Sequence, residues 1–146
     1  MHDVAETPDG AWPEFLRHEE IVDPIDVRGI RRAMWVVSIE GERLEETRLS
    51  DETLRGGPAT YPDCREEARR LRGEGASGLV APSAALEPGA SVRCRVDGGL
   101  IREPREDSVT IALFGPRPAL VGFLASPRAR PAEDLVGSVR YFSEAP

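Results

Sequence analysis

Residues 60–75, TYPDCREEARRLRGEG, constrain the fold more than any other segment, because they both start and stop a helix within their own sequence. Thr60 and Pro62 are typical of a helix start, and Gly73 and Gly75 are typical of its end. The apolar side chains of this segment repeat at helical spacing and share one face: Cys64, Ala68 and Leu71. The sequence therefore predicts an amphipathic helix over residues 60–75.

Short apolar segments bounded by turn residues predict the strands. Residues 77–81, SGLVA, follow the helix after a tight turn and suit a buried strand, and residues 108–114, SVTIALF, suit a second one. Residues 33–40 predict a third strand, because they are rich in β-branched and aromatic side chains. The segment VRCRVDGGLIRE predicts a hairpin that turns at its Asp-Gly pair, and residues 135–142 predict a last edge strand.

The first helix is predicted within residues 7–20. Thr7 suits the N-cap and Pro8 the first helical position. Pro13 leaves a second start open, because a proline inside a helix removes one backbone donor and clashes with the preceding turn. With either start we expect Glu14 in the first turn, where the helix dipole favours a carboxylate.

Length and charge narrow the class of protein. A chain of 146 residues fits one domain, so residues 1–146 are interpreted as a single domain. The net charge of −7 argues against nucleic-acid binding, which depends on clustered cationic side chains. All 19 basic residues are arginine, which excludes a Schiff-base lysine and a phosphate-loop lysine.

The cysteine, histidine and apolar patterns bear on location and metals. The two cysteines, Cys64 and Cys94, have no CxxC spacing, so reduced thiols in the cytoplasm are expected. Two histidines and two cysteines at unrelated spacings predict no metal site. No apolar run approaches the ~20 residues of a membrane span. We therefore expect a cytoplasmic protein that neither spans a membrane nor binds a metal.

Ser83 lies among alanines directly after the predicted strand that ends at Pro82. No G-x-S-x-G motif surrounds it, and the only imidazoles are those of His2 and His18, so a serine-hydrolase triad is disfavoured. The hydroxyl has two remaining interpretations. It caps a turn after Pro82, or it positions a ligand without acting as the nucleophile.

Four segments together resemble the RES domain family: AWPEFLRHEE, MWVVSI, YPDCREEARRLRGEGASGLVAPSAALEPG and VTIALF. The resemblance extends from about Val4 to Phe114, and its most specific part is the run around Pro82-Ser83-Ala84. The order of elements also matches, with a Glu-bearing helix early and the serine late. On this resemblance Glu14 is the family glutamate and Ser83 the family serine.

The resemblance implies an α+β fold similar to that of ADP-ribosyltransferases, with a small mixed sheet and flanking helices. It also implies an enzyme that degrades NAD as the toxin of a toxin-antitoxin pair, with a helix-turn-helix antitoxin as partner. NAD is then the substrate, and no resident cofactor is expected. Glu14 and Ser83 are the implied catalytic residues, with Glu14 stabilising positive charge on the ribose and Ser83 holding the substrate.

The chain also departs from the family pattern. The family arginine belongs to a segment before the Glu-bearing helix and has no counterpart here, where Asp3 stands at a position commonly taken by tyrosine. Arg17, Arg28 and Arg31 are candidates to replace it, and the spacing selects none of them. Three alternatives stay open: an active enzyme whose N-terminal segment lies upstream, a degenerate domain that acts only as an interaction protein, or a globular protein of unrelated function. A homo-oligomer and the acceptor of the reaction also stay open.

Overall fold

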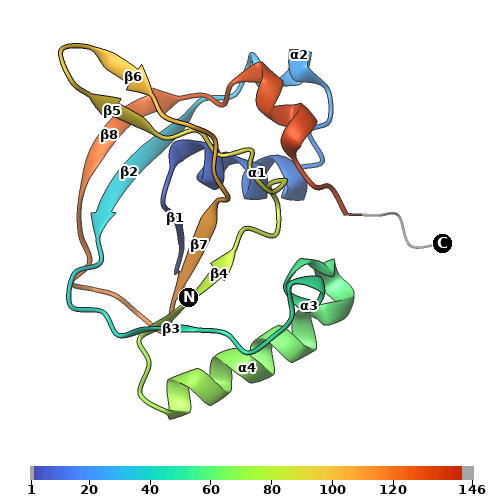
Figure 1. Cartoon of the computed structure of the whole chain (residues 1–146), viewed down its shortest axis with the longest axis vertical. Helices are drawn as coiled ribbons and strands as arrows, with labels where there is room; N and C mark the ends of the chain where they lie inside the picture. Colours follow the sequence, from blue (N-terminus) through green and yellow to red (C-terminus); the bar gives the residue numbers. More distant parts are fainter. Residues whose placement is uncertain (1, 143–146) are drawn as a thin grey trace.

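A four-stranded mixed sheet lies at the centre of the computed structural model, which describes residues 2–142 (Figure 1). Its strands follow the order β1 (His2–Ala5), β7 (Val109–Leu113), β4 (Gly78–Pro82) and β3 (Leu44–Glu46). β7 pairs antiparallel with both β1 and β4, whereas β3 pairs parallel with β4. The sheet thus brings the first described residues beside a strand from late in the chain.

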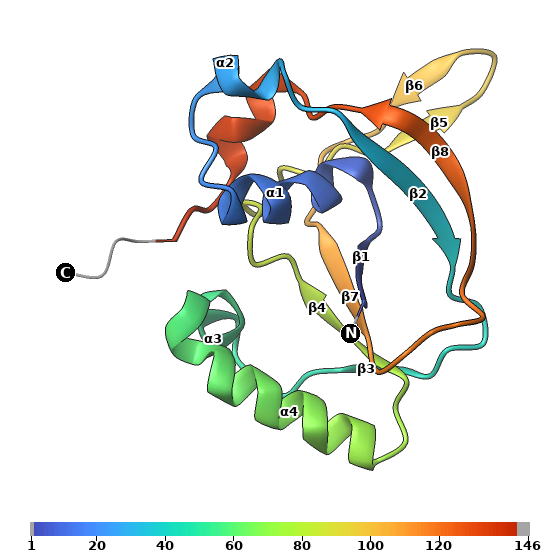
Figure 2. The same cartoon turned by 180° about the vertical axis from the view of Figure 1, so that it is seen from behind.

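Two further strands form a separate ribbon. β2 (Arg32–Ser38) pairs antiparallel with β8 (Val121–Ala129), and the register shifts between Arg32 and Trp35. Figure 2 shows this ribbon as a long arch that stands apart from the four-stranded sheet. A short hairpin of β5 (Cys94–Val96) and β6 (Leu100–Arg102) extends near it.

The helices lie on different sides of this framework (Figure 1). They are α1 (Pro8–His18), α2 (Pro24–Val27), α3 (Asp51–Arg55), α4 (Tyr61–Gly73) and the 3-10 helices η1 (Gly57–Thr60) and η2 (Glu133–Ser138). With its helices and mixed strands, the protein has an α+β fold. Among residues 2–142, no helix has both the length and the apolar character that a membrane crossing requires.

Two apolar clusters stabilise the fold. The larger one joins α1, α2, η2 and the segment after β4, and its buried members are Trp12, Leu16, Val27, Leu86, Ala90, Leu135, Val136 and Val139. The smaller one lies under α4 and consists of Leu71, Ala76 and Phe114. Leu16 and Leu86 are among the largest fully buried side chains, so the larger cluster fixes α1 against the segment after β4.

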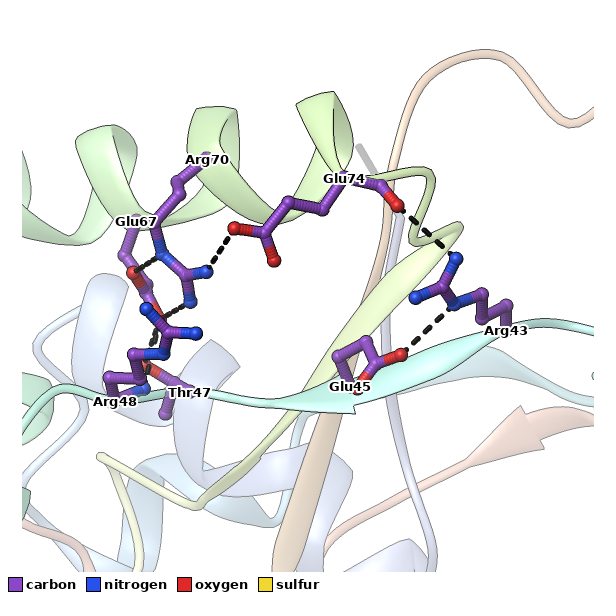
Figure 3. Close-up of polar contacts among 7 residues, drawn as sticks. All are labelled: Arg43, Glu45, Thr47, Arg48, Glu67, Arg70 and Glu74. Carbon is purple, nitrogen blue, oxygen red and sulfur yellow. Dashed lines mark hydrogen bonds and ion pairs between the residues drawn. The ribbon is translucent and has the colours of Figure 1, made fainter.

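A buried carboxylate links α4 to the segment after β3 (Figure 3). Glu67 accepts hydrogen bonds from Arg70 at 2.8 Å through Nε and Nη2, from the backbone N–H of Arg48 at 2.8 Å and from the Thr47 hydroxyl at 3.3 Å. Arg70 also pairs with Glu74 at 2.7 Å. These contacts satisfy a carboxylate that the fold has removed from water.

The predicted helix and central strands are confirmed. The helix predicted over residues 60–75 is α4, and the segments 77–81 and 108–114 contain β4 and β7. The Asp-Gly hairpin is confirmed as β5 and β6. β4 differs in one respect, because most of its residues are only half buried rather than enclosed on both faces.

Three expectations were wrong or incomplete. The tail 135–142 is not an edge strand, because its apolar residues turn into η2 and join the larger cluster, leaving only an isolated bridge between Val139 and Leu86. α1 begins at Pro8, so Pro13 is interior and Glu14 lies in the second turn rather than the first. The sequence patterns also did not predict β1 or β8.

Candidate functional site

A cleft of about 710 Å³ lies between α1 and the β2–β8 ribbon, lined by residues of α1, β1, β2 and β7. We call it the α1–β2 cleft. Its aromatic lining consists of Trp12, Phe15 and Trp35, and its charged lining consists of Asp3, Glu6, Glu14 and Arg32. Ligand sites typically enclose about 300–1,000 Å³ and combine aromatic walls with a few polar groups. The α1–β2 cleft has both features, which makes it the candidate site.

Glu14 lies in the second turn of α1 and lines this cleft. Its side chain is 33 % exposed, so a ligand can reach the carboxylate. The carboxylate Oε2 lies 3.3 Å from Arg17 Nη2 and 3.5 Å from His18 Nε2. Both contacts are made to the same oxygen, Oε2, so Arg17 and His18 orient the carboxylate through that atom. The side chain stays accessible from the cleft.

Arg17 lies behind Glu14 and is almost fully buried, with a side chain that is 6 % exposed. It donates from Nη2 to Glu14 at 3.3 Å and from Nη1 to the carbonyl of Ala84 at 3.1 Å. Its guanidinium carbon lies 4.2 Å from the centroid of the Phe142 ring, which is a cation–π contact. Arg17 is therefore a fixed bridge between α1 and the segment after β4.

Ser83 is 2 % exposed and does not line the α1–β2 cleft. Its hydroxyl oxygen accepts hydrogen bonds from the backbone N–H groups of Ala85 at 3.3 Å and Leu86 at 3.2 Å. Its own backbone N–H donates to the carbonyl of Ser108 at 2.8 Å. Ser83 therefore caps the turn after β4, which was one of the two interpretations of this residue.

The two candidate residues are connected through Arg17 rather than by direct contact. Ser83 holds the turn that contains Ala84, the Ala84 carbonyl accepts a hydrogen bond from Arg17, and Arg17 holds Glu14. Contacts of this kind fix rotamers and so preorganise a functional side chain. Glu14 is the member of this series that lines the cleft, and the other residues position it.

Buried hydroxyl groups hold the start of α1 in place. The Thr7 hydroxyl accepts a hydrogen bond from Gly10 N at 3.0 Å, which confirms it as the N-cap, and lies 2.7 Å from the Ser91 hydroxyl. A Cβ on Gly10 would lie 2.3 Å from the Ser108 Oγ, so only glycine allows this close approach. The Thr7 cap was predicted from the sequence, but the approach of Ser91 and Ser108 to the helix start was not, because no local pattern brings these two positions there.

The arginine candidates fall into different environments. Arg28 pairs with Glu133 at 2.7 Å, and its hydrogen bond lowers the pKa of that carboxyl. Arg31 donates to the backbone carbonyls of Arg28 and Ile30. Neither residue lines the cleft. The arginine that does so is Arg32, which no sequence pattern singled out because it stands just before the predicted strand.

Neither metal ligation nor known relatives define the site. In the part of the chain from residue 2 to residue 142, no three His, Cys, Asp or Glu side chains are grouped so that they could hold a metal ion. No family model matches the chain, and no curated protein and no solved structure matches it. What the α1–β2 cleft can bind and do therefore follows from its own side chains.

Proposed function

We propose that this protein cleaves the bond between nicotinamide and ribose in NAD, with Glu14 as the catalytic carboxylate. The observation that carries the proposal is the position of Glu14, which lines an aromatic cleft of about 710 Å³ and is held from behind by buried Arg17. An oriented carboxylate in a partly enclosed cleft stabilises positive charge that develops on a bound ligand. The resemblance to the RES domain family assigns the same residue.

The chemistry of this bond matches the residues of the cleft. When the C1′–N bond breaks, its electron pair stays on the nicotinamide nitrogen, which neutralises the pyridinium, and the ribose becomes an oxocarbenium-like cation. A carboxylate beside the ribose stabilises that cation until an acceptor adds to C1′ and loses its proton. Glu14 is the cleft carboxylate that a buried cation holds in one orientation.

The aromatic lining supports a substrate that carries flat rings. Trp35 is 60 % exposed and Phe15 is half buried, whereas Trp12 is buried in the larger cluster. Exposed ring faces bind flat or cationic heterocycles by stacking and cation–π attraction. The pyridinium and adenine rings of NAD are ligands of this kind. The cleft volume is also in the range that suits a ligand of this size.

In this proposal Ser83 is a positioning residue. Its hydroxyl accepts hydrogen bonds from two backbone N–H groups, and the residue is not part of the cleft lining, so it neither attacks nor holds the substrate. It acts through Ala84 and Arg17, which set the place of Glu14. This replaces the direct contact with ribose or phosphate that the family resemblance implies for the serine.

The wider context belongs to the same proposal. By family resemblance the protein has the RES variant of the ADP-ribosyltransferase fold and acts in the cytoplasm as the toxin of a toxin-antitoxin pair. A helix-turn-helix antitoxin is the partner. Growth arrest with a fall in cellular NAD on expression of the chain, reversed by the product of a neighbouring gene, is the expected behaviour.

A second function is favoured by the β2–β8 ribbon. Trp35, Val121 and Phe123 are more than half exposed on this ribbon. An exposed apolar surface of this kind is typical of a protein-binding site. A catalytically inactive domain that binds a partner through the ribbon is therefore the alternative, and it predicts no NAD turnover from folded protein.

The test is NAD consumption by the purified protein, with chromatographic detection of free nicotinamide. We expect turnover in the wild type and a fall of about 10²-fold or more in Glu14→Gln, which keeps the shape of the side chain but removes its charge. Glu19→Gln is the matched control, because it removes the same charge from an exposed position at the end of the same helix. Turnover equal in wild type and Glu14→Gln, or none from folded wild type, would overturn the proposal.

A further inference from the structure

Arg32 is the cationic side chain that lines the α1–β2 cleft. It is exposed at the start of β2, and its guanidinium carbon lies 5.2 Å from the centroid of the Phe15 ring. Within residues 2–142 it forms no ion pair with a carboxylate. A charged guanidinium thus stands at the cleft wall beside an aromatic ring, with its charge not neutralised by the described part of the protein.

The other arginines of this region are engaged. Arg17 is buried between Glu14 and the Ala84 carbonyl, Arg28 pairs with Glu133, and Arg31 donates to backbone carbonyls. Their donors are used to hold the fold together. Arg32 differs because its guanidinium contacts a ring face and forms no hydrogen bond with the residues that the structure describes, so the N–H groups of its planar fork are available to an anion.

The carboxylates of the cleft do not cancel this cation. Glu14 is paired with Arg17, and Glu6 lies 3.4 Å from Arg93. Asp3 comes from β1 and Arg32 from β2, and neither forms an ion pair within the described residues. The cleft therefore offers one unpaired cation and one unpaired anion together with aromatic faces. A ligand that joins an anionic group to flat rings fits this combination.

We infer that Arg32 binds a phosphate group of the ligand, so that the cleft selects phosphorylated nucleotides over the corresponding nucleosides. A guanidinium fork matches the geometry of phosphate oxygens and forms charge-assisted hydrogen bonds with them. The exposed Trp35 then receives the rings, beside the Phe15 ring that Arg32 contacts. This inference rests on the proposed function in that it uses the same cleft, and it names the residue that decides the substrate class.

The chain provides its own probe for the test. Its two tryptophans, Trp12 and Trp35, both line the cleft, so intrinsic fluorescence reports on the site. Fluorescence and calorimetric titrations with ADP and with adenosine compare ligands that differ in the phosphates. We expect ADP to bind about 10- to 100-fold more tightly than adenosine, because hydrogen bonds to charged groups contribute that order of affinity.

The variant Arg32→Gln should lose this preference, with ADP binding weakened at least about tenfold and adenosine binding unchanged. Arg128→Gln is the matched control, because it removes an exposed arginine of the same ribbon that does not line the cleft. It should keep the preference. For turnover, Arg32→Gln should raise KM for NAD about tenfold with little change in kcat, because the phosphate contact is the same in substrate and transition state.

The outcomes separate this inference from the proposed function. If the protein prefers ADP to adenosine through Arg32 but leaves NAD intact, NAD cleavage is overturned and the phosphate subsite is upheld. If the wild type cleaves NAD, and Arg32→Gln and Arg128→Gln lose ADP affinity equally, the phosphate subsite is overturned and NAD cleavage is upheld. The subsite is also overturned if fluorescence and calorimetry both detect no binding of ADP or adenosine to the wild-type protein.

Discussion

Two helices of this protein each carry a Glu–Arg pair three residues apart, and the two pairs are buried in opposite ways. On α1 the arginine Arg17 is 6 % exposed and the carboxylate of Glu14 is 33 % exposed. Figure 3 shows the pair on α4, Glu67 with Arg70. There the carboxylate is 8 % exposed and the arginine is 27 % exposed. The same local spacing thus has two outcomes. On α1 the arginine is buried and the carboxylate is accessible, whereas on α4 the carboxylate is buried and the arginine is more exposed.

The contacts explain what each pair does. Glu67 receives hydrogen bonds from Thr47, Arg48 and Arg70, and Arg70 and the backbone of Arg48 together lower its pKa to about 2. A carboxylate with that many donors is a structural link between α4 and the segment after β3. Glu14 has side-chain neighbours on one oxygen and faces a cleft. The comparison shows that a Glu–Arg pair leaves its carboxylate accessible to a ligand when the arginine is the buried partner.

The largest expected difference in stability comes from removing each carboxylate. Glu67→Ala should lower the free energy of unfolding by about 3 kcal/mol, because it leaves the backbone N–H of Arg48 and the guanidinium of Arg70 without their acceptor in a partly buried site. Glu14→Ala should cost less than about 1 kcal/mol, because its side chain is partly exposed and its pairs resemble surface ion pairs. Urea unfolding followed by circular dichroism measures both values. Equal losses in the two variants would contradict the assigned roles.

Removing the buried arginine of α1 is the next largest effect. Arg17→Gln should lower the free energy of unfolding by about 2 kcal/mol, because the Ala84 carbonyl loses its donor and Phe142 loses its cation. It should also lower kcat for NAD about tenfold or more by releasing Glu14 from its orientation. Arg43→Gln is the control: it removes an exposed arginine paired with Glu45 and should change stability by less than about 1 kcal/mol and turnover not at all.

A second variant sharpens this result, because loss of kcat in Arg17→Gln could follow from local unfolding alone. Ser83→Ala should cost about 1 kcal/mol by freeing two backbone N–H groups, and should lower kcat less than Arg17→Gln does. Since Ser83 acts through Arg17, the double variant should lose less than the sum of the single losses, by about 0.5 kcal/mol or more. Strictly additive losses would show that the two residues act separately.

The last expected effect is on the pH dependence of stability, and it distinguishes the α4 pair. The pKa of Glu67 is lowered from 4.5 to about 2, mainly by the hydrogen bonds from Arg70. Its contribution to stability is therefore present above about pH 4.5 and is lost as the pH falls towards 2, since the unfolded state binds a proton that the folded state does not. The slope from one such group is at most about 1.4 kcal/mol per pH unit. Urea midpoints between pH 5 and pH 2 should fall less steeply in Glu67→Gln than in the wild type.

Local signals were sufficient where neighbours in sequence supply the stabilising contacts. α4 begins and ends close to its predicted bounds because Pro62 and the glycines act within a few residues of themselves. The Thr7 cap and the Asp-Gly hairpin were predicted for the same reason, since a cap or a tight turn joins groups that are close along the chain. Glu14 was predicted as a site residue by resemblance; it lines the α1–β2 cleft, and its catalytic role stays a prediction.

Other elements escaped prediction because their partners are distant in sequence. β8 contains Gly122 and Pro127, which argue against a strand, but it pairs only with β2 and its register shifts near Pro127. A strand with a free edge tolerates such residues. β1 is too short and polar to show a pattern, and it forms because β7 offers it an unpaired edge.

What the sequence alone determined is the set of local elements: the bounds of α4, the capped start of α1, the hairpin turn and the exclusion of lysine chemistry. Tertiary structure decided which charged side chains became accessible. Arg17 is enclosed by Ala84 and Phe142, whereas Arg32 is left at the cleft wall, although both are arginines with no distinguishing local pattern. The physical reason is that burial and pairing are set by segments far apart in the chain, and the protonation, orientation and reach of a side chain follow from them.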